Sequence, residues 1–183
     1  MKSRFILLLL LVYVIASGNK ELFSQEMKEE VFVQKSPFAD QSTWVLGYFV
    51  RGQITRPPHS EWFKKGYDEY IINPEVLDRI LKISFDGLSI KIILGTWCPD
   101  SRKQVPRFMK IIDAWRFPEN AVTFIGVDDA KISPVGEYIQ LGIERVPTFI
   151  FYKNNIEAGR IIENPLTSLE QDIVNILTGN EKN

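Results

Sequence analysis

The segment 89–96 (SIKIILGT) constrains the fold most strongly, because it is short, apolar and rich in β-branched residues. Strands of this composition are buried on both faces of a sheet, so other layers must cover both sides. Residues 100–115 follow almost at once, with apolar side chains at helical spacing. A buried strand that leads directly into an amphipathic helix predicts an α/β domain built around a central sheet.

Further strands and helices alternate along the rest of the chain. Asn73 followed by Pro74 is a helix start, since asparagine caps helices and proline suits their first position. A tight turn at residues 153–155 makes the last two strands antiparallel. We predict further strands over 43–50, 121–127, 148–152 and 156–162, and further helices over 60–70, 74–86, 134–141 and 165–177.

Length and composition exclude several classes of protein. A chain of 183 residues with 45% hydrophobic side chains is long enough for one domain with a substantial core. The net charge of −1 gives no basic footprint for nucleic acid. Because Cys98 is the single cysteine and His59 the single histidine, we expect no disulfide scaffold and no metal site. His59 lies beside two prolines and is predicted to be a surface loop residue.

The first residues have the pattern of a secretory signal peptide. Lys2 and Arg4 form a basic start, and residues 5–16 are apolar. That apolar run is shorter than the ~20 residues a membrane-spanning helix needs. We therefore predict a signal peptide over 1–18 and an extracytoplasmic protein, periplasmic or secreted.

The site of cleavage has more than one reading. Small residues favour a cut before Asn19, and a cut after Ser24 is the rival. If the segment is an uncleaved anchor, it is the one expected contact with a membrane. Residues 19–72 are predicted to be an N-terminal extension, and residues 73–183 the main domain.

The segment 97–101 (WCPDS) carries the most chemistry, because it joins a strand end to a helix start. The partial positive charge and free N–H groups of a helix N-terminus favour a thiolate over a thiol at Cys98. Arg102 and Lys103 act in the same direction, and Asp100 opposes them. The position predicts a reactive thiol.

The segment 95–102 (GTWCPDSR) resembles the W-C-x-x-C active-site segment of thioredoxin-like proteins. Pro106 stands where that family's long helix carries a proline, and 145–148 (RVPT) resembles its cis-proline loop. The resemblance covers about residues 74–178 and is nearest to extracytoplasmic thioredoxin-like proteins of bacteria. It implies a thioredoxin-like α/β sandwich, with a central mixed sheet flanked by helices and preceded by the N-terminal extension.

Two departures from the family pattern change the expected activity. Ser101 replaces the second, resolving cysteine, and Ile92 replaces a buried acid that assists it. A dithiol reductase needs one thiol to attack and another to expel the client. Cys98 alone supports monothiol thiol–disulfide exchange, either isomerisation or the formation of mixed disulfides, with an external thiol or reductase for turnover.

The resemblance also implies roles for the surrounding residues. Cys98 is the nucleophile, and Ser101 is expected to donate a hydrogen bond that favours its thiolate. The partners expected are client protein thiols or disulfides, and no cofactor is implied. The extended client chain is expected to dock on Trp97, Pro99, Val146 and Pro147, with Trp97 as an exposed apolar ledge.

Other functional classes remain beside this hypothesis. If Cys98 is an inert remnant, the fold serves as a redox-inactive binding or chaperone-like module. An exposed aromatic surface between residues 44 and 70 would then contact the clients, although such residues more often form core. A peroxidase is less favoured, because Gly95 stands where the P-x-x-x-T-x-x-C arrangement requires threonine.

Overall fold

The computed structural model describes residues 40–179. The predicted signal peptide over 1–18, both of its cleavage sites and most of the extension before residue 40 lie outside the described residues. Within residues 40–179, no helix has the length and apolar character needed to cross a membrane.

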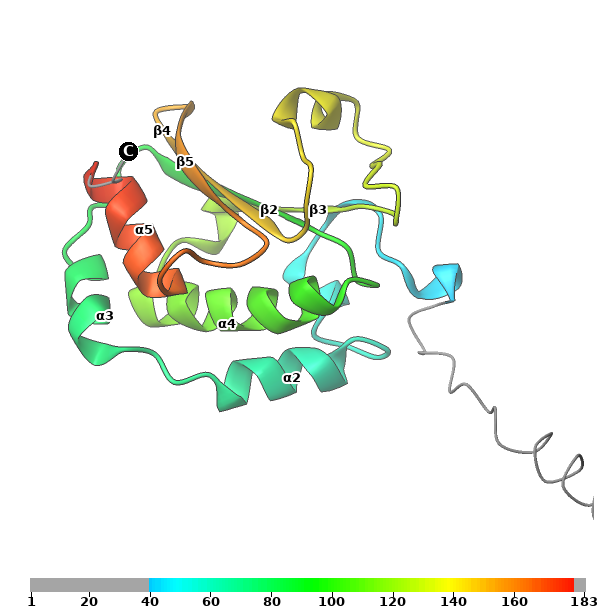
Figure 1. Ribbon diagram of the computed structural model, residues 1–183, viewed down its shortest axis with the longest axis horizontal. Coiled ribbons are helices and arrows are strands. Elements are labelled where there is room, and N and C mark those ends of the chain that lie inside the picture. The colour runs from blue at the N-terminus through cyan, green and yellow to red at the C-terminus, as the bar shows by residue number, and fades with distance from the viewer. Residues whose placement is uncertain (1–39, 180–183) are drawn as a thin grey trace, which may run out of the picture. The chain divides into compact units, whose positions relative to one another are not determined.

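The structure contains one five-stranded mixed sheet (Figure 1). β2 runs parallel to β3, whereas β1 pairs antiparallel with β3, β4 with β2, and β5 with β4. The antiparallel pairing of the last two strands confirms the prediction from their tight turn. The strands, in their order across the sheet, are β1 (Gly47–Phe49), β3 (Val122–Gly126), β2 (Leu88–Leu94), β4 (Thr148–Lys153) and β5 (Ile156–Ile162).

The structure has a helical segment in each predicted range, although some of these segments are shorter than predicted. The Asn73 side chain caps α3 by accepting hydrogen bonds from two backbone amides, as predicted. That helix ends at Ile80, well before residue 86. The last helix starts at Leu169 rather than 165, because Ser168 caps it. The α-helices are α2 (Ser60–Glu69), α3 (Pro74–Ile80), α4 (Pro99–Trp115) and α5 (Leu169–Thr178), and the 3-10 helices are η2 (Gln41–Thr43), η3 (Arg51–Gln53), η4 (Glu119–Ala121) and η5 (Gly136–Leu141).

The first strand is shorter than the predicted segment 43–50. Thr43, the first residue of that segment, belongs to η2, which Asp40 caps. Pairing with β3 begins at Gly47. Before that pairing starts, the carbonyl of Val45 passes so close to Gly126 that a Cβ there would lie 1.9 Å from its oxygen. Glycine at position 126 therefore permits the approach of the N-terminal segment.

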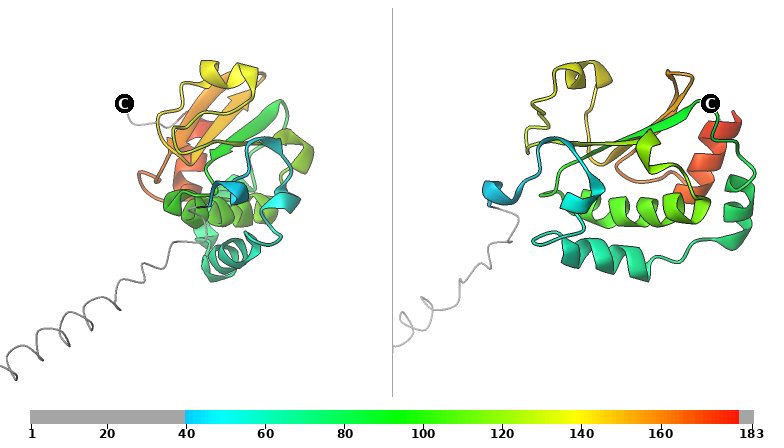
Figure 2. Two further views of the ribbon diagram at one scale, coloured as in Figure 1. Left: turned by 90° about the vertical axis from the view of Figure 1, so that its right-hand side faces the viewer. Right: turned by 180° about the vertical axis from the view of Figure 1, so that it is seen from behind.

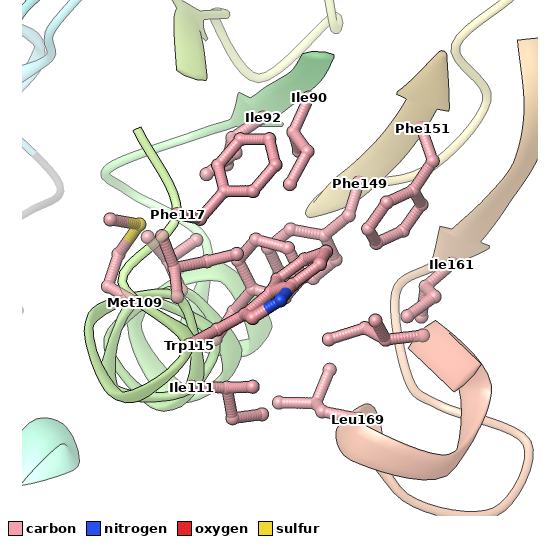
Figure 3. Packing of buried hydrophobic residues seen from close by; sticks show 14 of the residues in the cluster. Ile90, Ile92, Met109, Ile111, Trp115, Phe117, Phe149, Phe151, Ile161 and Leu169 are labelled. Atoms are coloured by element: carbon pink, nitrogen blue, oxygen red, sulfur yellow. The ribbon is translucent and has the colours of Figure 1, made fainter. Parts of the chain in front are cut away.

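One face of the sheet carries the larger core, under α4. Phe108 of α4 stacks on Phe149 of β4 with ring centroids 4.2 Å apart, and both are fully buried. Trp115 and Phe117 belong to the same core, with their ring centroids 4.9 Å apart. Figure 3 shows how the aromatic rings and isoleucines of this cluster fill the space between α4, the strands and α5.

The opposite face carries a smaller core. Ile93, Ile125 and Ile150 project from neighbouring strands and pack with Tyr138 of η5. Cys98 belongs to this smaller cluster. Adjacent residues of β2 thus enter different cores, which confirms a strand buried on both faces. The fold class is as predicted, an α/β thioredoxin-like sandwich with a central mixed sheet and flanking helices.

Residues 40–72 pack into this same unit. They supply the edge strand β1 and the helix α2, which lies against α4 on the side away from the sheet (Figures 1 and 2). Arg51 holds Asp113 of α4 through two hydrogen bonds of 2.7 Å. Lys110 donates to the carbonyl of Tyr70 at 2.6 Å. The described part of the extension thus packs directly against the main domain. The boundary at residue 72 stays a prediction.

Candidate functional site

Cys98 is the N-cap residue of α4, where the sequence places it. Its backbone N–H donates to the carbonyl of Gly95 at 2.9 Å, and its carbonyl accepts from the amide of Arg102 at 3.1 Å. The side chain is only 6% exposed. The sulfur therefore stands at the positive end of a long helix, just beneath the surface.

The thiol meets a loop that is far away in the sequence. Cys98 Sγ donates to the carbonyl oxygen of Val146 at 3.3 Å. The following peptide bond, between Val146 and Pro147, is cis. The structure therefore brings together Cys98, Val146 and Pro147. Val146 is one of the residues predicted to contact a client, and here its carbonyl accepts a hydrogen bond from the thiol itself.

Trp97 is held in place beside the thiol. Its indole N–H donates to the carbonyl of Val127 at 3.0 Å, and its ring packs on Trp44 at 6.2 Å. The indole lies so close to Gly95 that a Cβ there would be 2.5 Å from it. Trp97 is half-buried rather than the exposed ledge expected from the sequence, whereas Pro99 is exposed.

Ser101 is fully buried beneath the thiol loop. Its hydroxyl oxygen accepts a hydrogen bond from the backbone N–H of Gly95 at 3.3 Å. Among the hydrogen bonds of residues 40–179, none joins this hydroxyl to the sulfur of Cys98. This hydrogen bond links the residue that follows β2 to the first turn of α4.

Arg102, in the first turn of α4, lies close to the thiol. Burial lowers the pKa of Arg102, while the thiol of Cys98 acts in the opposite direction. An arginine side chain stays protonated in proteins. A cation therefore lies within electrostatic reach of the sulfur.

His59 was predicted to lie on the surface, and this prediction is wrong: it is 2% exposed. Its Nδ1 accepts from the indole N–H of Trp62 at 3.4 Å. Burial lowers the pKa of His59, with Arg102 adding to that effect and the backbone of Thr43 opposing it. Sequence reasoning missed His59 because its cover comes from segments distant in the chain. The one local signal is Trp62, one helical turn later.

The arrangement is suited to sulfur chemistry. A single thiol lies at a helix start, near one cation, against the carbonyl of a loop. Within the described part of the chain, no group of three histidine, cysteine or acidic residues could hold a metal ion. The side chains that meet at the site therefore support a nucleophilic or binding role for Cys98.

Comparison with known proteins adds little to this geometry. No family model matches the chain, and no curated protein matches it significantly. A thioredoxin from Trypanosoma brucei brucei is 26% identical, covers 59% of this chain and 88% of its own, and has a TM-score of 0.36. A protein of unknown function from Pseudomonas aeruginosa is 13% identical over 67% of this chain and 81% of its own, with a TM-score of 0.46. An HIV epitope-scaffold is 17% identical over 66% and 72%, with a TM-score of 0.40. The fold assignment therefore rests on the strand order and connections of the chain itself.

Proposed function

We propose that this protein is a monothiol thiol–disulfide exchange protein outside the cytoplasm, with Cys98 as its nucleophile. The observation that carries the proposal is the position of Cys98 at the N-cap of α4, with the carbonyl of Val146 against its sulfur and the cis Pro147 next in that loop. That sulfur lies at the positive end of the helix, within electrostatic reach of Arg102. Within the same proposal, Pro99 and Trp97 border the client-binding surface.

The exchange proceeds in two balanced steps. The Cys98 thiolate attacks one sulfur of a client disulfide, forms a mixed disulfide with it and expels the other client sulfur as a thiolate. An external thiol, or the expelled client thiol, then attacks the mixed disulfide and releases the Cys98 thiolate. Ser101 cannot perform this second step, because it has no sulfur. Release of the client therefore depends on a second thiol from outside the chain.

The hydrogen bond from Cys98 to Val146 sets a condition on this chemistry. The Cys98 thiol donates its hydrogen to the Val146 carbonyl, and the residue is almost buried. The loop at Val146 must move for the sulfur to reach a client. Movement of this loop therefore controls whether the Cys98 sulfur can attack a client disulfide.

The direct test is the rate of Cys98 alkylation by iodoacetamide, measured against pH on the full chain and on free cysteine. The proposal expects iodoacetamide to modify Cys98 in the folded chain, as it modifies free cysteine, because exchange requires a sulfur that the reagent can reach. Cys98→Ser, which has no thiol, is the control for modification elsewhere in the chain. A reaction that requires unfolding of the chain would refute the exchange function.

A second test asks for clients directly. Mixed disulfides between Cys98 and proteins of the native compartment are trapped by acid quenching and separated without reductant. Wild-type protein is expected to yield them and Cys98→Ser to yield none. Serine is favourable at an N-cap, so this variant retains the fold. Wild-type protein without trapped clients would contradict the proposal.

The burial of Cys98 also favours a second candidate, a redox-inactive binding module. In that case the thiol is a packing residue of the smaller core, where it lies beside Ile93 and Val146. If the protein is a redox-inactive binding module, Cys98→Ser should bind every client as well as wild-type protein does. The exchange protein predicts that covalent capture is lost with the sulfur.

A further inference from the structure

A cavity of about 350 Å³ opens beside the first turns of α4, away from the smaller core. Its volume falls within the range of small-molecule binding sites, at the lower end. The side chains that matter for its chemistry are those of Tyr70, Lys103, Gln104, Arg107, Asn164 and Ser168.

Two cationic side chains line this cavity, Lys103 and Arg107, one helical turn apart on α4. Lys103 is exposed and Arg107 half-buried. The Arg107 guanidinium lies over the ring of Tyr70, 5.5 Å from its centroid, which holds the group at the wall. Among the ion pairs of residues 40–179, none involves either cation. The wall therefore carries two positive charges with no carboxylate paired to them.

Two acidic side chains of α5 near the cavity make hydrogen bonds of their own. Glu170 is buried and accepts the hydroxyl hydrogen of Tyr70 at 2.7 Å. Asp172 is also buried and accepts from the backbone amides of Leu166 and Thr167, at 2.6 and 3.2 Å. Neither acid lines the cavity. An anionic ligand would meet both cations, and no carboxylate is among the residues that line the cavity.

The cavity and the thiol lie at the same end of α4. Lys103 follows Cys98 by five residues, which is about 7.5 Å along the helix axis and about 140° around it. The amide of Glu163 donates to the carbonyl of Pro147 at 2.7 Å. The next residue, Asn164, accepts from Gln104 of α4 at 2.8 Å. One loop thus borders both the proline of the thiol site and the cavity.

We infer that this cavity binds the carboxylate of a small thiol or disulfide, and that an anionic small thiol releases clients from Cys98. The second half of this inference rests on the proposed function. Lys103 supplies a point charge, and the planar Arg107 supplies paired N–H donors that match the two carboxylate oxygens. The exchange step is the one given above, with the small thiolate as the attacking group.

The binding test uses a matched pair of small disulfides, dithiodipropionate with two carboxylates and cystamine with two ammonium groups. Binding to full-length Cys98→Ser, which cannot exchange, is measured by calorimetric titration. Dithiodipropionate is expected to bind saturably and cystamine not to bind. Loss of one charge-assisted contact in Lys103→Gln should weaken binding at least about tenfold. Lys65→Gln, an exposed lysine on α2, is the control and should change nothing.

Lys103 is exposed, so Lys103→Gln tests the cavity without disturbing the core, whereas Arg107→Gln also loses the contact with Tyr70. Equal binding of cystamine, or an equal loss in Lys65→Gln, would overturn the inference. The rate of mixed-disulfide formation on wild-type protein then separates the two proposals. Binding without exchange refutes the exchange function and leaves the anionic site standing. Exchange at equal rates with both disulfides refutes the role of the cavity.

Discussion

The two faces of the sheet are built for different purposes. The face under α4 is a large aromatic core in which Phe108, Trp115 and Phe149 are completely buried. The opposite face is a small cluster that is closed by η5 and includes Cys98. Most of the buried apolar residues therefore lie on the face away from the thiol. Residues around the sulfur can therefore vary in chemistry while the larger core keeps the fold.

The largest effect is expected from Phe108→Ala. This ring lies at the centre of the larger core, stacked on Phe149. Its removal should lower the free energy of unfolding by about 3–5 kcal/mol, because a cavity remains where the ring was. Urea denaturation followed by tryptophan fluorescence measures the loss. A decrease below about 1 kcal/mol would show that this face is not the main source of stability.

A sharper comparison uses two neighbouring residues of β2, Ile92 in the larger core and Ile93 in the smaller one. Both are fully buried, so Ile92→Val and Ile93→Val should each cost about 0.5–1.5 kcal/mol of unfolding free energy. Only Ile93→Val should raise the rate of Cys98 alkylation, because Ile93 packs in the cluster of the thiol. Equal alkylation rates in the two variants would break the division between the faces.

A smaller effect concerns the layer formed by α2 against α4. His59 is buried with a lowered pKa, so the folded chain binds fewer protons than the unfolded chain below the ordinary value of 6.5. Its contribution to stability is complete above that value and declines as the pH falls through it. Comparing the unfolding free energy of wild-type protein and His59→Gln from pH 7.5 to about pH 5 should show a shallower decline in the variant. Parallel curves would show that His59 does not titrate differently on folding.

The sequence predicted the elements of the fold, because the signals for them are local. Apolar spacing marked the strand at 89–96 and the helix at 100–115, and Asn73 with Pro74 marked a helix start. The ends of elements were less accurate. The segment 43–50 has the composition of a strand, but only Gly47–Phe49 finds a partner, in β3. The composition of a strand gives its propensity, and the neighbouring strand decides its length.

The candidate site was predicted as far as the thiol and its helix. Cys98 at the start of α4 follows from the order of residues, because a buried strand passes straight into a helix there. The partners of the thiol required distant segments to meet. The carbonyl of Val146, the anchoring of Trp97 and the burial of His59 all depend on which loop covers which. No spacing within one segment contains that information.

The order of the amino acids thus predicts the succession of strands and helices and one cysteine at a helix N-terminus, since backbone dipoles and apolar periods are properties of neighbouring residues. Tertiary structure alone decided that the thiol is nearly closed over by Val146, and that Lys103 and Arg107 line one cavity without a paired acid. Burial and charge pairing arise between residues that are far apart in the chain. The exposed fraction of a side chain and its charged partners are therefore set only when the chain has folded.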